Sequence, residues 1–259
     1  MNLDTLKETA MAMVGGGKGI LAADESTPTI GKRFETINTE STEESRRRYR
    51  EMLFTSEGAN NYIGGVILFD ETIRQSASDG TPFPKFLDDL GIVPGIKVDT
   101  GAKPLAGHNG ETVTEGLDGL RDRLAEYYSL GARFAKWRAV INIDDVLPSD
   151  FCIKANAHAL ARYSALCQEK NIVPIVEPEV LMDGGHSIER CEEVTNKVLK
   201  TVFKELQEHA VNLEGIVLKP NMIISGAKAN NRANSDTVAE ATIRCLKENV
   251  PESVPGIAF

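Results

Sequence analysis

The sequence lacks any run of about eighteen consecutive apolar residues, the length that a membrane-spanning helix requires. Its first residues, MNLDTLKETAMAMVGGGKG, contain acidic side chains and no apolar core of the kind found in signal peptides. We therefore expect a cytoplasmic protein that has no membrane partner.

Cysteines and histidines are few, with four of each in 259 residues. The cysteines are Cys152, Cys167, Cys191 and Cys245, and the histidines are His108, His158, His186 and His209. No CxxC, HxxH or HxxxH spacing joins them, so the pattern predicts neither a disulfide framework nor a metal site. Each histidine is interpreted as an ordinary surface or loop residue.

Positive charge is also in short supply, because 29 lysines and arginines face 38 acidic residues and leave a net charge of −9. An acidic chain is poorly suited to binding nucleic acid or an anionic membrane. A local cluster of lysine and arginine can still bind an anionic small molecule.

What the sequence does contain is a regular alternation of short apolar segments and helical patterns. The apolar segments, each bounded by Gly or Pro, cover 19–24, 64–69, 94–99, 133–138, 173–178, 215–220 and 255–259. The helical patterns cover 42–56, 113–130, 155–169, 188–209 and 236–249. This alternation predicts βαβ units and a parallel sheet, as a doubly wound sheet or a closed barrel. No GxGxxG follows the first segment, so a Rossmann site has no support, and the length suits one (β/α)₈ domain over 1–259.

Charged side chains close most of the apolar segments. Asp24 ends the first segment and Lys219 the sixth, and the pairs Lys97/Asp99, Lys136/Arg138 and Glu177/Glu179 end others. Members of each pair are two residues apart, so they face the same side of their strand. Because the carboxyl ends of barrel strands meet at one mouth, where active sites lie, we expect these groups to share a cavity.

Such a cavity suits amine chemistry. A desolvated lysine close to other cations has a lowered pKa and can act as a nucleophile, while neighbouring carboxylates transfer protons. An amine-rich site fits Schiff-base formation on a carbonyl and binding of phosphate, for which arginine is the better clamp. Two alternatives remain open for the same residues: a structural ion-pair network inside the barrel, and a Lys219 that merely reaches the surface.

Six segments in order resemble class I fructose-1,6-bisphosphate aldolase. They are GILAADEST, GGVILF, GIKVD, FAKWR, VPIVEPE and LEGIVLKPNM. The resemblance runs from Lys18 to Phe259 and includes pieces such as KPLAG, NGET, GLDGL and LARYSALCQ. It implies a (β/α)₈ barrel, a lyase of glycolysis and gluconeogenesis that needs neither metal nor other cofactor, a phosphorylated sugar substrate and a homotetramer.

The resemblance also implies five catalytic roles. Lys219 would form the Schiff base with the ketone of the bisphosphate. Glu177 would be the acid and base that helps to dehydrate the carbinolamine, and Glu179 would be a supporting carboxylate. Lys136 would lie beside the nucleophile, lower its pKa and stabilise the carbinolamine. Asp24 would hold the nascent C4 hydroxyl and share in its deprotonation.

Basic groups for hydroxyl and phosphate oxygens follow from the same resemblance. They are Lys97, Arg138, Arg33 and, as a weaker candidate, Arg46. Asp99 is interpreted either as a residue that orients Lys97 or as a simple ion-pair partner. Trp137 alternates away from Lys136, so we expect it to pack between the sheet and the helices.

The chain ends at VPGIAF, which resembles the seventh strand of the family. In the family a Ser-Gly-Gly turn, an eighth strand with an arginine and a flexible tail with a tyrosine follow. We therefore expect a C-terminally incomplete barrel with seven of eight strands, as a fragment of a longer protein or as a natural short form. If the protein itself ends at Phe259, weak or absent bisphosphate cleavage is expected.

The expected function is reversible cleavage of fructose 1,6-bisphosphate to dihydroxyacetone phosphate and glyceraldehyde 3-phosphate. Two alternatives remain open. One is a truncated, non-catalytic homologue that serves as a binding or scaffold protein. The other is an aldolase that prefers another phosphorylated ketose, such as sedoheptulose bisphosphate or fructose 1-phosphate.

Overall fold

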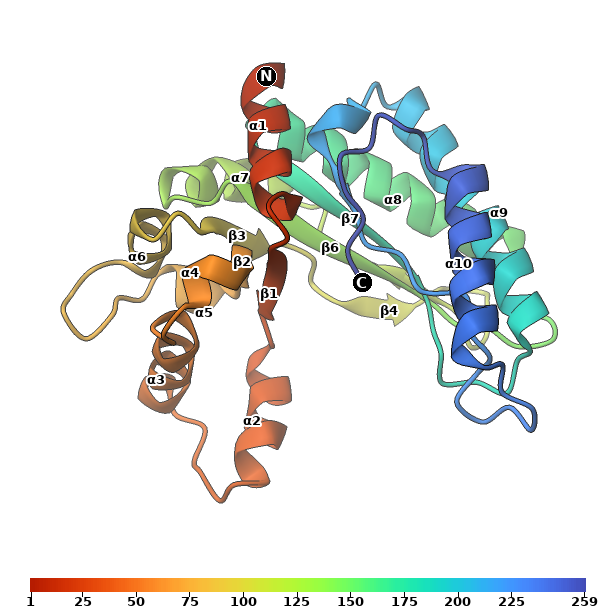
Figure 1. Ribbon diagram of the computed structural model, residues 1–259, viewed down its shortest axis with the longest axis horizontal. Helices are drawn as coiled ribbons and strands as arrows, with labels where there is room; N and C mark the ends of the chain where they lie inside the picture. The colour runs from red at the N-terminus through yellow and green to blue at the C-terminus, as the bar shows by residue number, and fades with distance from the viewer.

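A curled parallel sheet forms the centre of the computed structural model, which describes residues 1–259. Its strands are β1 (Gly19–Ala23), β2 (Ile63–Leu68), β3 (Val93–Lys97), β6 (Phe134–Ile141), β7 (Val173–Val180) and β8 (Val217–Leu218). They lie side by side in chain order, and all are parallel. A doubly wound sheet would reverse its strand order at a switch point, so this order confirms the barrel class. The sheet forms part of a barrel wall (Figure 1).

The helices lie mainly on the outside of the sheet, although the first one precedes β1 and packs against the inner face. They are α1 (Leu3–Val14), α2 (Thr27–Glu35), α3 (Glu43–Phe54), α4 (Ala59–Tyr62), α5 (Asp70–Ile73), α6 (Phe83–Asp89), α7 (Leu120–Ser129), α8 (Asp150–Glu169), α9 (Ile188–Glu208) and α10 (Ser235–Asn249), with the short 3₁₀ helix η1 (Leu213–Gly215). Helices α8, α9 and α10 pack in sequence along one side of the molecule (Figure 1). None of the helices combines the length and the apolar character needed to cross a bilayer.

Helix α3 begins where the sequence predicts it to begin. The hydroxyl of Thr42 accepts a hydrogen bond from the backbone N–H of Ser45 at 3.1 Å, and the Ser45 hydroxyl accepts one from the N–H of Thr42 at 2.9 Å. This reciprocal cap satisfies two amides that a helix start leaves free.

The helix predicted over 113–130 is only partly present. It starts at Leu120, because Gly116 (φ 128°) and Gly119 (φ 65°) adopt left-handed conformations that interrupt a helix. Residues Thr112–Thr114 instead form β5, which pairs antiparallel with β4 (Ala102–Pro104) in a small hairpin. The sequence analysis did not predict this hairpin.

The predicted strand over 255–259 is reduced to a single parallel bridge between Leu218 and Ile257. The Leu218 N–H donates to the Gly256 carbonyl, and the Ala258 N–H donates to the Leu218 carbonyl. Its partner β8 is only two residues long, because Pro220 has no N–H to extend the ladder. A short strand therefore limits how far the last segment can pair.

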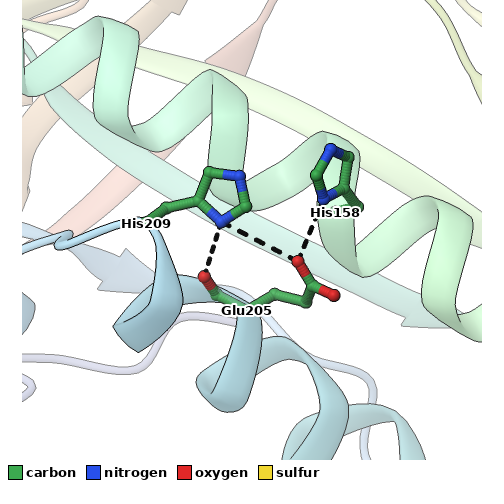
Figure 2. Close-up of side chains that lie close together, drawn as sticks. All are labelled: His158, Glu205 and His209. Atoms are coloured by element: carbon green, nitrogen blue, oxygen red, sulfur yellow. Dashed lines mark hydrogen bonds and ion pairs between the residues drawn. The ribbon is translucent and has the colours of Figure 1, made fainter.

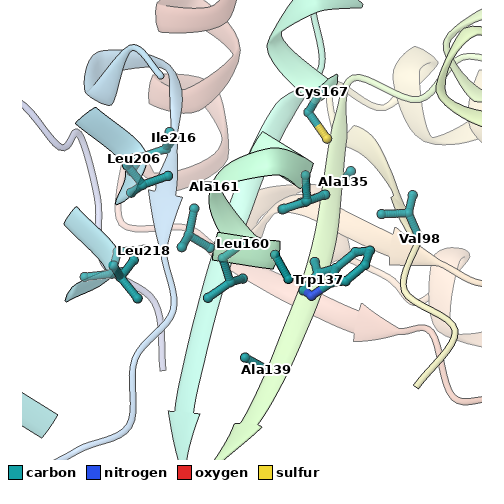
Figure 3. Packing of buried hydrophobic residues seen from close by; sticks show 14 of the residues in the cluster. Val98, Ala135, Trp137, Ala139, Leu160, Ala161, Cys167, Leu206, Ile216 and Leu218 are labelled. Atoms are coloured by element: carbon teal, nitrogen blue, oxygen red, sulfur yellow. The ribbon is translucent and has the colours of Figure 1, made fainter. Parts of the chain in front are cut away.

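Two apolar clusters lie on opposite faces of the sheet. The larger, outer cluster fills the space between the strands and helices (Figure 3). In it the fully buried Trp137 stacks on Tyr163 of α8 at 5.5 Å between ring centroids, which confirms the packing role expected for Trp137. The smaller, inner cluster brings Leu6, Ala10 and Met13 of α1 against the inner face of the sheet. Helix α1 therefore forms an apolar floor inside the curled sheet.

Candidate active site

Inward-facing side chains change from apolar to charged along β6 and β7. On β6, Phe134 belongs to the inner apolar cluster, while Lys136 and Arg138, on the same face, carry charge. On β7, Ile175 belongs to that cluster and Glu177 follows it on the same face. The strand period of two therefore places a layer of charges above the apolar floor.

Lys219 lies at the end of β8 and contacts a buried carboxylate. Its Nζ donates a hydrogen bond to Glu177 Oε1 at 2.6 Å, and Glu177 is only 2% exposed. The backbone N–H of Lys219 donates to the Val176 carbonyl at 2.8 Å, so the strand ladder fixes the position of this residue. Asn221 accepts a hydrogen bond from the Val180 N–H at 3.1 Å and ties the loop after Lys219 to the end of β7.

Lys136 lies between two carboxylates from neighbouring parts of the site. Its Nζ is 3.0 Å from Asp24 Oδ2 and 3.6 Å from Glu177 Oε2. Burial lowers the pKa of Lys136, but the negative charges of Asp24 and Glu177 outweigh burial and leave the pKa raised. Lys136 therefore stays an ammonium ion at neutral pH.

The remaining members of the predicted pairs also make contacts, although only Lys97 and Asp99 contact each other within one pair. Lys97 Nζ donates to Asp99 Oδ1 and to the Asp99 carbonyl oxygen, both at 2.7 Å. Arg138 forms an ion pair with Glu179. Burial lowers the pKa of Arg138, but its hydrogen bond and ion pair with Glu179 outweigh burial, so the net effect is a raised pKa. Each i, i+2 pair thus contributes to a network of alternating charge.

A cavity of about 590 Å³ opens beside this network, and cations dominate its charged lining. Lys97, Lys136 and Arg138 line it together with Asp99. Such a cavity suits an anionic, hydroxylated ligand, because ammonium and guanidinium groups bind phosphate and hydroxyl oxygens. Lys219 instead borders a second, mostly apolar cavity of about 330 Å³. Lys136 and Glu177 connect the two regions.

Two predicted basic residues lie outside this cluster. Arg33 has a 58% exposed side chain and pairs with Glu25, the residue after Asp24. Arg46 makes two hydrogen bonds to the carboxylate of Glu71, at 2.7 and 2.6 Å. Neither arginine lines the cavity beside Lys97.

Three residues that the structure brings to the site were not predicted from the sequence. Ser26 and Arg123 line the larger cavity, and Asn221 positions the loop after Lys219. Ser26 and Asn221 lie two residues after the predicted catalytic residues Asp24 and Lys219. The motifs AADES and LKPNM could therefore have indicated that they belong to the site. Arg123 lies on α7, where charged residues are expected to face solvent, and no sequence pattern marks it.

Comparisons with known proteins agree with this geometry. The family model "Fructose-bisphosphate aldolase class-I" matches residues 5–259. A probable class 1 fructose-bisphosphate aldolase from Xanthomonas campestris is 61% identical over 259 residues, which cover all of this chain and 78% of the relative. The cytoplasmic isozyme of fructose-bisphosphate aldolase from Spinacia oleracea is 53% identical over 99% of this chain and 71% of its own length.

A solved structure gives the same result. Fructose-bisphosphate aldolase from Plasmodium falciparum, crystallised with TRAP and a small-molecule inhibitor, superposes with a TM-score of 0.97 at 49% identity. The alignment covers 99% of this chain and 74% of that one. The class works through a lysine Schiff base without a metal ion. The chain belongs to the class-I fructose-bisphosphate aldolase family, whose members are carbon–carbon lyases.

Proposed function

We propose that Lys219 is the Schiff-base nucleophile of this chain and that the surrounding charges carry out the reversible cleavage of fructose 1,6-bisphosphate. The observation that carries the proposal is the contact between Lys219 and the buried Glu177, 2.6 Å apart, with the Lys136 ammonium on the other oxygen of the same carboxylate. An amine beside a proton-transfer group and a fixed positive charge is the arrangement that imine formation needs.

Imine formation uses Lys219 and Glu177. Lys219 first passes a proton to Glu177, and the neutral amine then attacks the C2 carbonyl, so a C–N bond forms as the C=O π bond breaks. A proton moves from the nitrogen to the oxygen to give the carbinolamine. Glu177 then returns its proton to the hydroxyl group, the C–O bond breaks, and water leaves an iminium ion. Glu179, which pairs with Arg138, would support this carboxylate, and Lys136 would stabilise the developing negative charge on oxygen.

Cleavage then uses the iminium ion as an electron sink. Asp24 accepts the proton of the C4 hydroxyl, the C3–C4 bonding electrons move towards the iminium, and glyceraldehyde 3-phosphate leaves. The remaining enamine takes up a proton at C3, and hydrolysis of the imine releases dihydroxyacetone phosphate and restores Lys219. Asp24 is suited to this step because it is only 8% exposed and already contacts Lys136.

Phosphate and hydroxyl groups would be bound by the cations of the cavity and its rim. Lys97 and Arg138 line the cavity, and Arg33 is exposed and free to turn towards a ligand. Arg46 is the weakest of the four, because a phosphate would have to displace Glu71 from its bidentate pair. Asp99 would orient the Lys97 ammonium through their 2.7 Å contact.

We also infer one barrel domain over residues 1–259, a cytoplasmic location and a homotetramer. The location is supported by the names of the spinach and Arabidopsis relatives, which are cytoplasmic or cytosolic isozymes. The tetramer rests on the family resemblance, and light scattering of the purified chain would test it through the molar mass.

Borohydride trapping tests the proposed nucleophile. The chain is incubated with dihydroxyacetone phosphate, reduced with borohydride and analysed by intact mass and peptide mapping. A single reduced adduct on Lys219 is expected, and Lys219→Arg should abolish it. Lys228→Arg, which changes an exposed lysine in the nearby loop, should leave trapping intact.

An adduct on another lysine, or none from a folded chain, would contradict the assignment of Lys219. Tight binding of the phosphorylated ketose without an adduct would instead favour the scaffold alternative. Comparing the rates of cleavage of fructose 1,6-bisphosphate, sedoheptulose bisphosphate and fructose 1-phosphate would establish the preferred ketose.

A further inference from the structure

A histidine–glutamate–histidine cluster lies between helices α8 and α9, on the outer side of the sheet and away from the lysine–carboxylate network. His158 comes from the middle of α8, Glu205 from the last turn of α9 and His209 directly follows α9. Figure 2 shows both imidazole rings gathered around Glu205. Spacing along the sequence could not reveal this cluster, because His158 lies on a different helix from the other two residues.

The contacts of the cluster resemble those around a metal ion. His158 Nδ1 is 3.0 Å and His209 Nδ1 3.8 Å from the same oxygen of Glu205 (Figure 2). One nitrogen of each ring and one carboxylate oxygen all lie within 4.8 Å of one another. Glu205 and His209 are four residues apart, the spacing that places two ligands on one face of a helix.

His209 is also held in a tautomer that leaves a ligand nitrogen free. Its Nδ1 lies 2.8 Å from the Glu205 backbone carbonyl oxygen. A carbonyl oxygen only accepts hydrogen bonds, so Nδ1 carries the hydrogen and Nε2 keeps its lone pair. Histidines that bind metals usually donate their second N–H to a carbonyl or a carboxylate in this way.

Glu205 is a buried carboxylate without a permanent cation at its side. It is only 7% exposed, and its ion-pair partners are the two imidazoles rather than a lysine or arginine. Burying a negative charge without a cation beside it is costly, and a bound metal ion would offset that cost directly.

We propose that His158, Glu205 and His209 form a site for a divalent transition-metal ion, with zinc as the best match. Zinc binds imidazole nitrogen and carboxylate oxygen in tetrahedral geometry, with ligand bonds of about 2.0–2.2 Å. A water molecule fills the fourth position. The ion clamps α8 to α9 and plays no part in the aldol chemistry, which the inner face of the sheet performs.

Closing the site requires a small movement that the structure allows. Bonds of that length place the ligand atoms about 3.3 Å apart, a spacing that the His158–Glu205 contact of 3.0 Å already approaches. The ion would bind His158 Nδ1, the Glu205 carboxylate and His209 Nε2, and His158 has room to turn towards it because its side chain is 51% exposed. The metal replaces the proton that His158 Nδ1 now donates to Glu205.

Metal titration of the tag-free full chain tests the proposal. Calorimetry with ZnCl₂ should give one ion bound per chain, and Co²⁺ should produce the visible absorption bands of a tetrahedral site. His158→Asn and Glu205→Gln should each weaken zinc binding about 100-fold, since loss of even an indirect partner of a metal costs 10–100-fold. Zinc should also raise the Tm of the wild-type chain but not that of either variant.

Two matched variants serve as controls. Glu208→Gln makes the same chemical change on an exposed carboxylate of α9, and His108→Asn removes a histidine outside the cluster. Both should bind zinc as the wild type does. All four cysteines are buried, so thiols do not compete for the ion in the folded chain. Equal zinc affinity in the wild type and the two cluster variants, or no stoichiometric binding by the wild type, would overturn the proposal.

Discussion

Replacing Lys136 with methionine should destabilise the fold strongly, because this ammonium holds two buried carboxylates together. Asp24 and Glu177 are 8% and 2% exposed, and both lie within 3.6 Å of Lys136 Nζ. Removing one partner of a buried ion pair costs about 3–5 kcal/mol, since the remaining charge is left uncompensated. Proton uptake sets an upper limit, because neutralising one ordinary carboxyl group at pH 7 costs about 4 kcal/mol. We therefore expect a loss of about 3–4 kcal/mol at pH 7.

The loss in stability caused by Lys136→Met should become smaller both in alkaline solution and below pH 7. The pKa of Lys136 is raised in the folded state, so its stabilising contribution is complete below the unfolded value of about 10.4 and disappears as pH rises through the higher folded value. The difference between wild type and variant should therefore shrink in strongly alkaline solution. It should also shrink below pH 7, by up to about 1.4 kcal/mol per pH unit, because proton uptake by a carboxylate becomes easier.

Urea unfolding, monitored by tryptophan fluorescence, measures this loss in the free energy of unfolding. Trp137 is the single tryptophan, it is fully buried and it neighbours Lys136 in the chain. The double variant Lys136→Met/Asp24→Asn also removes one of the two carboxylates left without a cation, so it should recover much of the lost stability. A loss below about 1 kcal/mol at pH 7, the range of surface ion pairs, would show that the site is hydrated and would refute the reasoning.

Two further predictions concern packing and the thiols. Gly95→Ala should lower the free energy of unfolding by about 1–3 kcal/mol in the same urea assay, because a Cβ at Gly95 would lie 2.3 Å from the Phe134 ring. Gly19→Ala is the matched control, since a Cβ there meets no atom within 4 Å, and an equal loss in both variants would contradict this account. Burial raises the pKa of Cys152 and of Cys245 to about 11, so a thiol reagent at pH 8 should modify them only after unfolding, and rapid modification of the native chain would show that these regions open.

Strand positions and the gathering of charged strand-end residues were predictable because both follow from short-range patterns. Period-two alternation put Lys136 with Arg138 and Glu177 with Glu179 on shared faces, and the structure joins Lys136 to Glu177 across neighbouring strands. Parallel order then carried Asp24 and Lys219 to the same end of the sheet. These conclusions needed only the direction of each strand and the face of each residue.

Features that depend on partners distant in sequence were not predictable. The raised pKa of Lys136 results from two carboxylates that lie 112 and 41 positions away in the chain, and their distances decide whether burial or attraction dominates. The pairing of His158 with Glu205 likewise depends on how α8 and α9 pack. The hairpin of β4 and β5 was not predicted because the spacing of apolar residues near Leu117 and Leu120 is typical of a helix. Only the backbone conformations of the glycines show that this helix starts after β5.

The inner face of the sheet also explains why charge and apolar packing occur together at this site. Below the charged layer, α1 places Leu6, Ala10 and Met13 against the strands and excludes water from the floor. Electrostatic attraction and hydrogen bonding are stronger where water is excluded, so the Lys136 ammonium acts more strongly on Glu177 and on any oxyanion beside it. The same floor makes an unpaired charge costly, which explains why each lysine of the layer contacts a carboxylate. The stability of this charged layer therefore depends on one requirement, that every lysine above α1 has a carboxylate partner.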